Sequence, residues 1–158
     1  MKKAIFMAAL LTCFNAFSLP AGVVEEKQAS ATVNPVVLQK FSERAKQNKN
    51  WKSSIKLGDH EQVIYMNVST STTPDNEIGS SKSSYDQLIL VAQGTALISL
   101  NGNASTVKSG DIVFIPQGTV YGIKNKSRIS KLKLASFCSR VSSPTDVAYK
   151  SKIDEKAN

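Results

Sequence analysis

The sequence predicts an all-β domain, an antiparallel sandwich or barrel that follows one N-terminal α-helix. After Trp51 the chain consists of short segments rich in Val, Ile, Leu and Thr, separated by turn signals. No alternation of strands with helices, which would indicate a parallel sheet, is visible. The length of 158 residues fits one domain, and a hydrophobic content of 41% is enough for a packed core.

The first residues have the pattern of a secretory signal peptide. Lys2 and Lys3 precede an apolar stretch that runs to Ser18 and is too short to span a bilayer comfortably. We expect cleavage after Ser18 or Ala21, so residues 1–18 form the signal peptide. The alternative is a retained N-terminal anchor. Export predicts a periplasmic or secreted protein that meets the membrane only through this segment.

Removal of the signal peptide changes the charge and the cysteine count. It lowers the formal net charge from +8 to +6, because it takes away two lysines and no acidic residue. It also takes away Cys13, so Cys138 is left without an intrachain disulfide partner. We predict that Cys138 is a small buried apolar side chain.

A flexible lead-in, residues 19–33, is expected before an N-terminal helical segment at 34–49. Asn34 and Pro35 resemble a helix start. Val37, Phe41 and Ala45 then recur at four-residue spacing, which predicts an amphipathic helix from Pro35 to Gln47.

Residues 50–138 are expected to form the barrel. Eight strands are predicted within this range. They cover 52–57, 61–69, 86–93, 95–100, 104–108, 111–116, 119–124 and 131–138. Asn101-Gly102-Asn103 is a strong hairpin signal. Residues 70–84 are predicted to be a long polar loop, and 139–158 a polar C-terminal tail.

The strand predicted at 86–93 is apolar on both faces. Gln87, Ile89 and Val91 are expected to face inward. Leu88, Leu90 and Ala92 are expected to face outward, where the helix, the other sheet or a second subunit must cover them.

The segment from Gly110 to Asn125 resembles the second sequence motif of the cupins. Its glycines, proline and asparagine stand at the spacing of that motif, as Gly110, Pro116, Gly118 and Asn125. Gly94, seven residues after Gln87, closes the first motif. The resemblance covers roughly residues 47–154 and is to small single-domain cupins of the RmlC-like type. It implies a double-stranded β-helix, or jelly-roll barrel, and a homodimer.

The metal site of such cupins is degenerate here. The resemblance places its four ligand positions at Ser81, Ser83, Gln87 and Tyr121, with Tyr121 where a histidine belongs. A serine hydroxyl and a neutral amide are poor ligands for transition ions, and His60 is the single histidine of the chain. We predict no metal and no cofactor. The four side chains either form a neutral pocket for a small polar ligand or satisfy one another in a filled barrel.

Three functions stay open at this stage. The first is an exported cupin that binds a small polar ligand or a partner in a non-catalytic role. The second is a cupin enzyme, of isomerase or dioxygenase type, with an unusual site. The third is a polyanion-binding surface, built on the basic runs at 46–52 and 124–133. Nucleic acid is not expected as a partner, because these runs lack interleaved aromatic residues and the protein is predicted to be exported.

Overall fold

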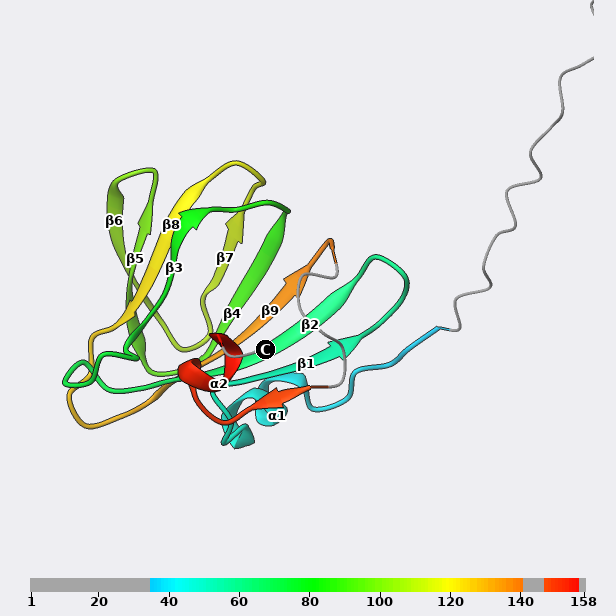
Figure 1. The fold of residues 1–158 in the computed structure, drawn as a ribbon, viewed down its shortest axis with the longest axis horizontal. Coiled ribbons are helices and arrows are strands. Elements are labelled where there is room, and N and C mark those ends of the chain that lie inside the picture. The colour runs from blue at the N-terminus through cyan, green and yellow to red at the C-terminus, as the bar shows by residue number, and fades with distance from the viewer. Residues whose placement is uncertain (1–34, 141–146, 157–158) are drawn as a thin grey trace, which may run out of the picture. The chain divides into compact units, whose positions relative to one another are not determined.

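The computed structural model describes residues 35–140 and 147–156 (Figure 1). The predicted signal peptide, the lead-in and part of the tail lie outside these residues. The elements, in chain order, are α1 (Phe41–Gln47), β1 (Lys52–Lys56), β2 (Gln62–Val68), β3 (Glu77–Lys82), β4 (Gln87–Gln93), β5 (Thr95–Leu100), β6 (Asn103–Lys108), β7 (Ile112–Ile115), β8 (Val120–Asn125), β9 (Leu132–Cys138), β10 (Ala148–Tyr149) and α2 (Lys152–Lys156).

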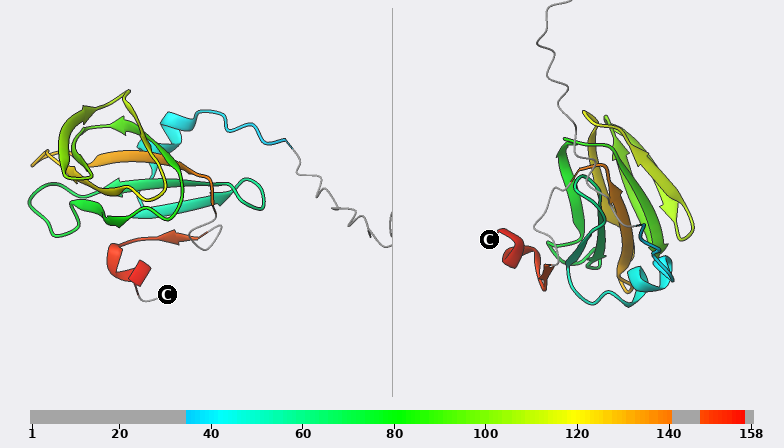
Figure 2. Two further views of the ribbon diagram at one scale, coloured as in Figure 1. Left: turned by 90° about the horizontal axis from the view of Figure 1, so that it is seen from above. Right: turned by 90° about the vertical axis from the view of Figure 1, so that its right-hand side faces the viewer.

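The strands form two antiparallel sheets, as the sequence predicts. One sheet has six strands in the order β10-β1-β2-β9-β4-β7, and the other has four in the order β3-β8-β5-β6. Figure 1 shows the four-stranded sheet on the left, and Figure 2 shows the sheets from two further sides. Neither described helix is long and apolar enough to cross a membrane.

The helix and the loop predicted at 70–84 differ from the prediction. Helix α1 begins at Phe41 and not at Pro35. The backbone of Lys40 has a left-handed conformation (φ 52°), so the helix cannot continue toward the N-terminus through this residue. The predicted loop contains β3, whose EIGSSK sequence lacks apolar alternation. Pairing with β8 holds this strand, with a register shift between Gly79 and Ser81.

The main core lies between the two sheets. Its fully buried members include Ile89, Ile98, Ile115, Ile123 and Leu134. These side chains come from both sheets and fill the barrel interior, as in other β-sandwiches.

A second apolar cluster lies under α1, on the outer face of the six-stranded sheet. Ala45 packs with Tyr65 and Ala92, and the Phe41 ring lies 4.7 Å from that of Phe137 and 5.6 Å from that of Tyr65. The helix therefore covers part of the outer face of β4. It was one of the three covers expected for the apolar outer face of this strand. Gln87, Ile89 and Val91 are buried on the inner face, as predicted.

Candidate functional site: a hydrogen-bonded network at the barrel mouth

Main-chain hydrogen bonds bring the two sequence motifs together. The turn after Pro116 is closed by the Thr119 amide, which donates to the Pro116 carbonyl at 3.2 Å. Gly118 N–H donates to the Ser83 carbonyl at 2.7 Å, and Ser83 N–H donates to the Thr119 carbonyl at 2.8 Å. The Asp86 carboxylate accepts the Gln117 amide at 2.7 Å. The chain before β4 is thus held directly against the turn before β8.

Two of the four predicted site residues meet in a hydrogen-bonded network. Gln87 Nε2 donates to Ser83 Oγ at 3.4 Å, and Ser83 Oγ–H donates to the Tyr85 carbonyl at 2.6 Å. Ser136 Oγ–H donates to Gln87 Oε1 at 3.4 Å. Ser83, Gln87 and Ser136 are all buried, so these bonds satisfy polar groups that water does not reach.

Tyr121 and Ser81 lie on neighbouring strands, where they form a register pair of β8 and β3. Tyr121 is half-buried and packs against the core, whereas Ser81 is exposed. Among the described residues, no hydrogen bond joins Tyr121 or Ser81 to Ser83 or Gln87. The four positions therefore divide into a buried polar pair and a more exposed strand pair.

The Tyr121 ring is placed by its contact with Gly79. A Cβ atom added at Gly79 would lie 2.8 Å from Tyr121 Cε2 and 2.7 Å from the Tyr121 carbonyl oxygen. Gly79 also has a φ of 86°, in the left-handed region that favours glycine. This glycine lets the ring approach β3 closely.

The predicted motif residues are structural. Gly94, Gly110 and Gly118 have φ values of 98°, 97° and 87°, so the turns that they make require glycine. Pro116 supplies the turn carbonyl described above.

Asn125 joins two loops, the one after β2 and the one between β8 and β9. Its Nδ2 donates to the carbonyls of Ser69 and Ser130, both at 2.9 Å, and its Oδ1 accepts the Ser127 amide at 2.9 Å. Its side chain is fully buried.

Metal ligands are not gathered at the site. Within residues 35–140 and 147–156, no three His, Cys, Asp or Glu side chains lie close enough to hold a metal ion. His60 is exposed in the turn between β1 and β2.

Cys138 is buried next to the network, with its Sγ 3.5 Å from Ser136 Oγ. Burial raises the pKa of its thiol above the usual value, and hydrogen bonds with Ser136 and Tyr85 oppose that shift. The neutral thiol is thus the stable form, and the location agrees with the predicted apolar role.

Sequence reasoning missed Ser136 as a member of the network. The signal was available, because Leu132, Leu134 and Ser136 alternate along one face of β9. Its position opposite Ile89 of β4 and Ile64 of β2 places it inside the barrel.

Solved structures resemble this fold. BH2720 from Bacillus halodurans matches with a TM-score of 0.71 and 22% identity, over 81% of this chain and 98% of that one. A cupin superfamily protein from Desulfitobacterium hafniense matches with a TM-score of 0.51 and 16% identity, over 70% of this chain and all of that one. This chain has the cupin fold. A Klebsiella pneumoniae protein with a double-stranded β-helix domain has a TM-score of 0.50 at 21% identity, over 60% and 79% of the two chains.

Comparisons of sequence, unlike the comparison of structures, find no match. No protein-family profile matches the chain, and no curated protein matches it. The cupin resemblance read from the motifs is therefore supported by the shape of the barrel.

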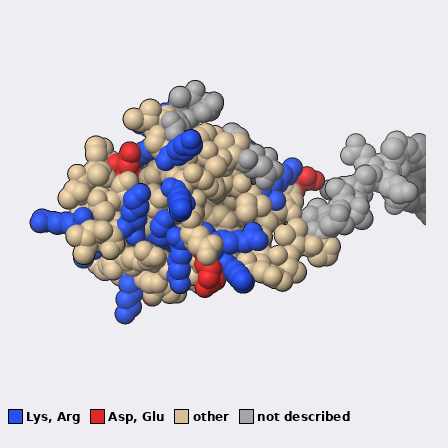
Figure 3. All heavy atoms as spheres, turned by 90° about the horizontal axis from the view of Figure 1, so that it is seen from below, with Lys and Arg blue, Asp and Glu red and all other residues tan. Residues whose placement is uncertain are grey.

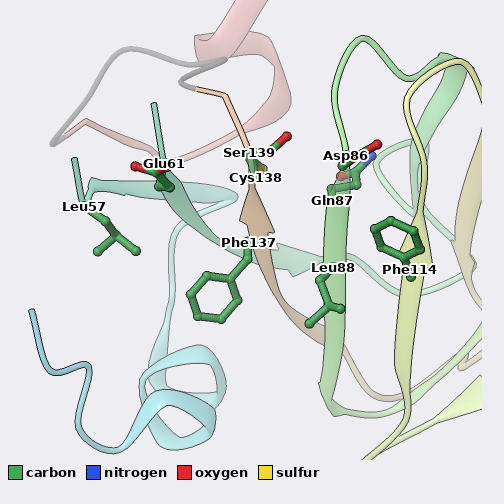
Figure 4. Close-up of a pocket in the computed structure, with 9 residues that line it drawn as sticks. All are labelled: Leu57, Glu61, Asp86, Gln87, Leu88, Phe114, Phe137, Cys138 and Ser139. Atoms are coloured by element: carbon green, nitrogen blue, oxygen red, sulfur yellow. The ribbon is translucent and has the colours of Figure 1, made fainter. Parts of the chain in front are cut away.

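An apolar groove of about 290 Å³ lies beside the network. Leu57, Phe137, Leu88 and Phe114 form a row across it (Figure 4). Glu61 and Asp86 also line it, and Phe114 is 56% exposed. β7, which carries Phe114, is an edge strand of the six-stranded sheet. An exposed apolar edge of this kind favours contact with another surface.

Proposed function

We propose that this protein is an exported, non-catalytic cupin that acts by binding, with no metal centre in its barrel. The observation that carries the proposal is the buried network of Ser83, Gln87 and Ser136. In this network each side chain uses its hydrogen-bonding groups on a neighbour. Neutral hydroxyl and amide groups already engaged with one another are poorly suited to bind a transition ion.

The filling of the barrel argues against catalysis in its interior. Apolar side chains occupy the space between the sheets, and Tyr121 packs against them. Charged groups that could act as a general acid and base pair are not part of the network. The enzymatic alternative would require a second arrangement of these residues.

We also propose that the protein is a homodimer that covers the apolar groove. Its support is the row of side chains on β4, β7 and β9, in which Leu88 and Phe137 are 39% and 37% exposed. Ile112, also on β7, is 59% exposed. A twofold axis would place the same patch of each copy against the other. Full burial of an exposed Leu, Ile or Phe side chain contributes about 1.5 to 3 kcal/mol, so covering these partly exposed side chains contributes roughly half of that each.

Metal analysis tests the first proposal. The protein is purified without a chelator, and iron, manganese, nickel and zinc are measured. We expect far less than one ion per chain. A stoichiometric ion that is lost on Gln87→Ala would overturn the proposal, and so would an enzymatic activity lost in Gln87→Ala and Tyr121→Phe.

Sedimentation tests the dimer. The wild type should sediment as a dimer, whereas Phe114→Asp should shift it to a monomer, because a buried carboxylate in an apolar interface is costly. Val120→Asp is the matched control, since Val120 is 50% exposed on β8 of the other sheet. A wild-type monomer would refute the dimer, and so would a Phe114→Asp variant that stays dimeric.

A further inference from the structure

A second pocket lies at the end of the six-stranded sheet where β2 ends and β9 begins. Its volume is about 180 Å³. The Ser83–Gln87–Ser136 network lies toward the opposite end of β9, so the two sites are separate. The pocket is below the range of drug-sized ligand sites and suits a small ion or molecule.

Lysines from distant parts of the sequence line this pocket. Lys49 follows α1, Lys131 precedes β9, Lys150 follows β10, and Lys152 is the first residue of α2. The fold thus joins one lysine from each basic run of the sequence and adds two from the tail. Figure 3 shows Lys and Arg side chains gathered on this side of the molecule, where acidic side chains are sparse.

The positive charge of the pocket is not neutralised by the described residues. Four lysines and Asp75 line it, a formal excess of three positive charges. No ion pair of 4.0 Å or less joins these lysines to a carboxylate of the described residues. Lys152 Nζ instead donates to the Glu77 carbonyl at 3.0 Å and lies 5.6 Å from the centre of the Trp51 ring.

Lys133 lies next to this pocket, opposite Asn67 in the register of β2 and β9. It is 9% exposed, and its ammonium donates to the Asn48 carbonyl. Burial lowers its pKa, and the charge of Lys131 lowers it further. An anion near Lys131 would relieve that repulsion.

Asn67 adds a buried acceptor to the pocket wall. It is 5% exposed, and its Nδ2 donates to the Lys49 carbonyl at 3.0 Å. Its Oδ1 has no hydrogen-bond partner among the described residues. Since the Nδ2 group must face the Lys49 carbonyl, the orientation of the amide is settled. A buried acceptor without a donor costs about 1 to 3 kcal/mol, and a ligand that brings an O–H donor, as the P–OH group of a hydrogen phosphate ion does, would supply the missing hydrogen bond.

We propose that this pocket binds a small tetrahedral oxyanion of the phosphate type. A dianion interacts with each ammonium twice as strongly as chloride or a monocarboxylate does at the same distance. The small volume argues for a compact ion over a polynucleotide. So does Trp51, because it is only 6% exposed and Lys152 lies over its ring, where a base would have to stack. This inference does not depend on the barrel.

Trp51 provides a direct test, because it lines the pocket and is the single tryptophan of the chain. The full chain is titrated with inorganic phosphate at constant ionic strength, maintained with NaCl, while tryptophan emission is recorded. The thermal midpoint is measured in parallel, because a ligand that binds the native state raises it. We expect saturation with a Kd below about 1 mM, and no saturation with acetate.

Lysine variants assign the site. Lys131→Gln and Lys150→Gln should each weaken phosphate binding about tenfold. Lys108→Gln, an exposed change of equal charge on β6, should leave the Kd unchanged. Glycerol 3-phosphate distinguishes two sources of the ligand. Tighter binding than that of inorganic phosphate would indicate a phosphate monoester, and weaker binding would indicate free phosphate.

Three results would overturn the proposal. One is the absence of saturation in both measurements up to about 10 mM phosphate. Another is an affinity that Lys131→Gln and Lys150→Gln leave unchanged. The third is acetate binding as tight as phosphate binding, which would show that the pocket does not select a dianion.

Discussion

Replacing Gly79 by alanine tests how the barrel mouth is built. Two costs add at this position. The left-handed backbone, with a φ of 86°, costs an alanine about 1 to 2 kcal/mol. The new Cβ would also lie 2.7 Å from the Tyr121 carbonyl oxygen and 2.8 Å from the ring, and such overpacking typically costs about 1 to 3 kcal/mol. We expect Gly79→Ala to lower the free energy of unfolding by about 2 to 5 kcal/mol.

Gly110→Ala is the matched control. Gly110 has a φ of 97°, but no heavy atom lies within 4 Å of the position of its added Cβ. It should therefore cost only the backbone term, about 1 to 2 kcal/mol. The difference between the two variants isolates the contact with Tyr121.

Urea denaturation, followed by the emission of Trp51, measures both variants. With a slope of about 1 to 3 kcal/mol per molar urea, the two midpoints should differ by about 1 M. Gly79→Ala should cost less in a Tyr121→Ala background than in the wild type, because the ring that the new Cβ would meet is gone while the carbonyl remains. Equal losses for Gly79→Ala and Gly110→Ala, within about 0.5 kcal/mol, would refute the packing of Tyr121 on β3.

Three further predictions concern buried polar groups. Asn125→Ala should lower the free energy of unfolding by about 2 to 4 kcal/mol because it removes three hydrogen bonds, whereas exposed Asn103→Ala should change it by less than about 0.5 kcal/mol. Similar urea midpoints for these two variants would contradict the role of Asn125. Tyr65→Phe should change stability by less than about 1 kcal/mol, because the buried Tyr65 hydroxyl has no hydrogen-bond partner within 3.5 Å among the described residues and interacts only more distantly with the Arg44 guanidinium. A clear loss in calorimetry would show that the hydroxyl is satisfied. In a chain carrying Cys13→Ser, Cys138 should react with iodoacetamide only as fast as the protein unfolds. Since burial raises the pKa of the Cys138 thiol above 9.0, the native state keeps its proton where the unfolded state loses it. Stability should therefore fall as pH rises past about 9, and Cys138→Ala should lessen that fall.

The strands could be predicted from sequence because their signals are local. Apolar residues alternate or run together between Gly, Asn and Pro turns, and each observed strand of the predicted set begins and ends within about two residues of its predicted bounds. β3 could not be found in this way. It is made of polar and small residues, and it is a strand because β8 offers it a partner.

The candidate site was predictable in part. Motif spacing led to Ser83 and Gln87, which the structure joins in one network with Ser136. The same spacing grouped Ser81 with them, although it is exposed on a bulged strand. A bulge of one residue changes the face to which a side chain points, and its position depends on the neighbouring strand.

By itself the sequence determined the all-β class, the cupin motif and the shortage of histidine, because these depend on residue types and short spacings. Only the tertiary structure decided which charges meet. Lys49, Lys131 and Lys150 are far apart along the chain and line one pocket because the start of β1, the start of β9 and the end of β10 lie at the same end of one sheet. Electrostatic interactions depend on distance in space, so a charge that is diffuse in the sequence becomes a defined basic pocket in the fold.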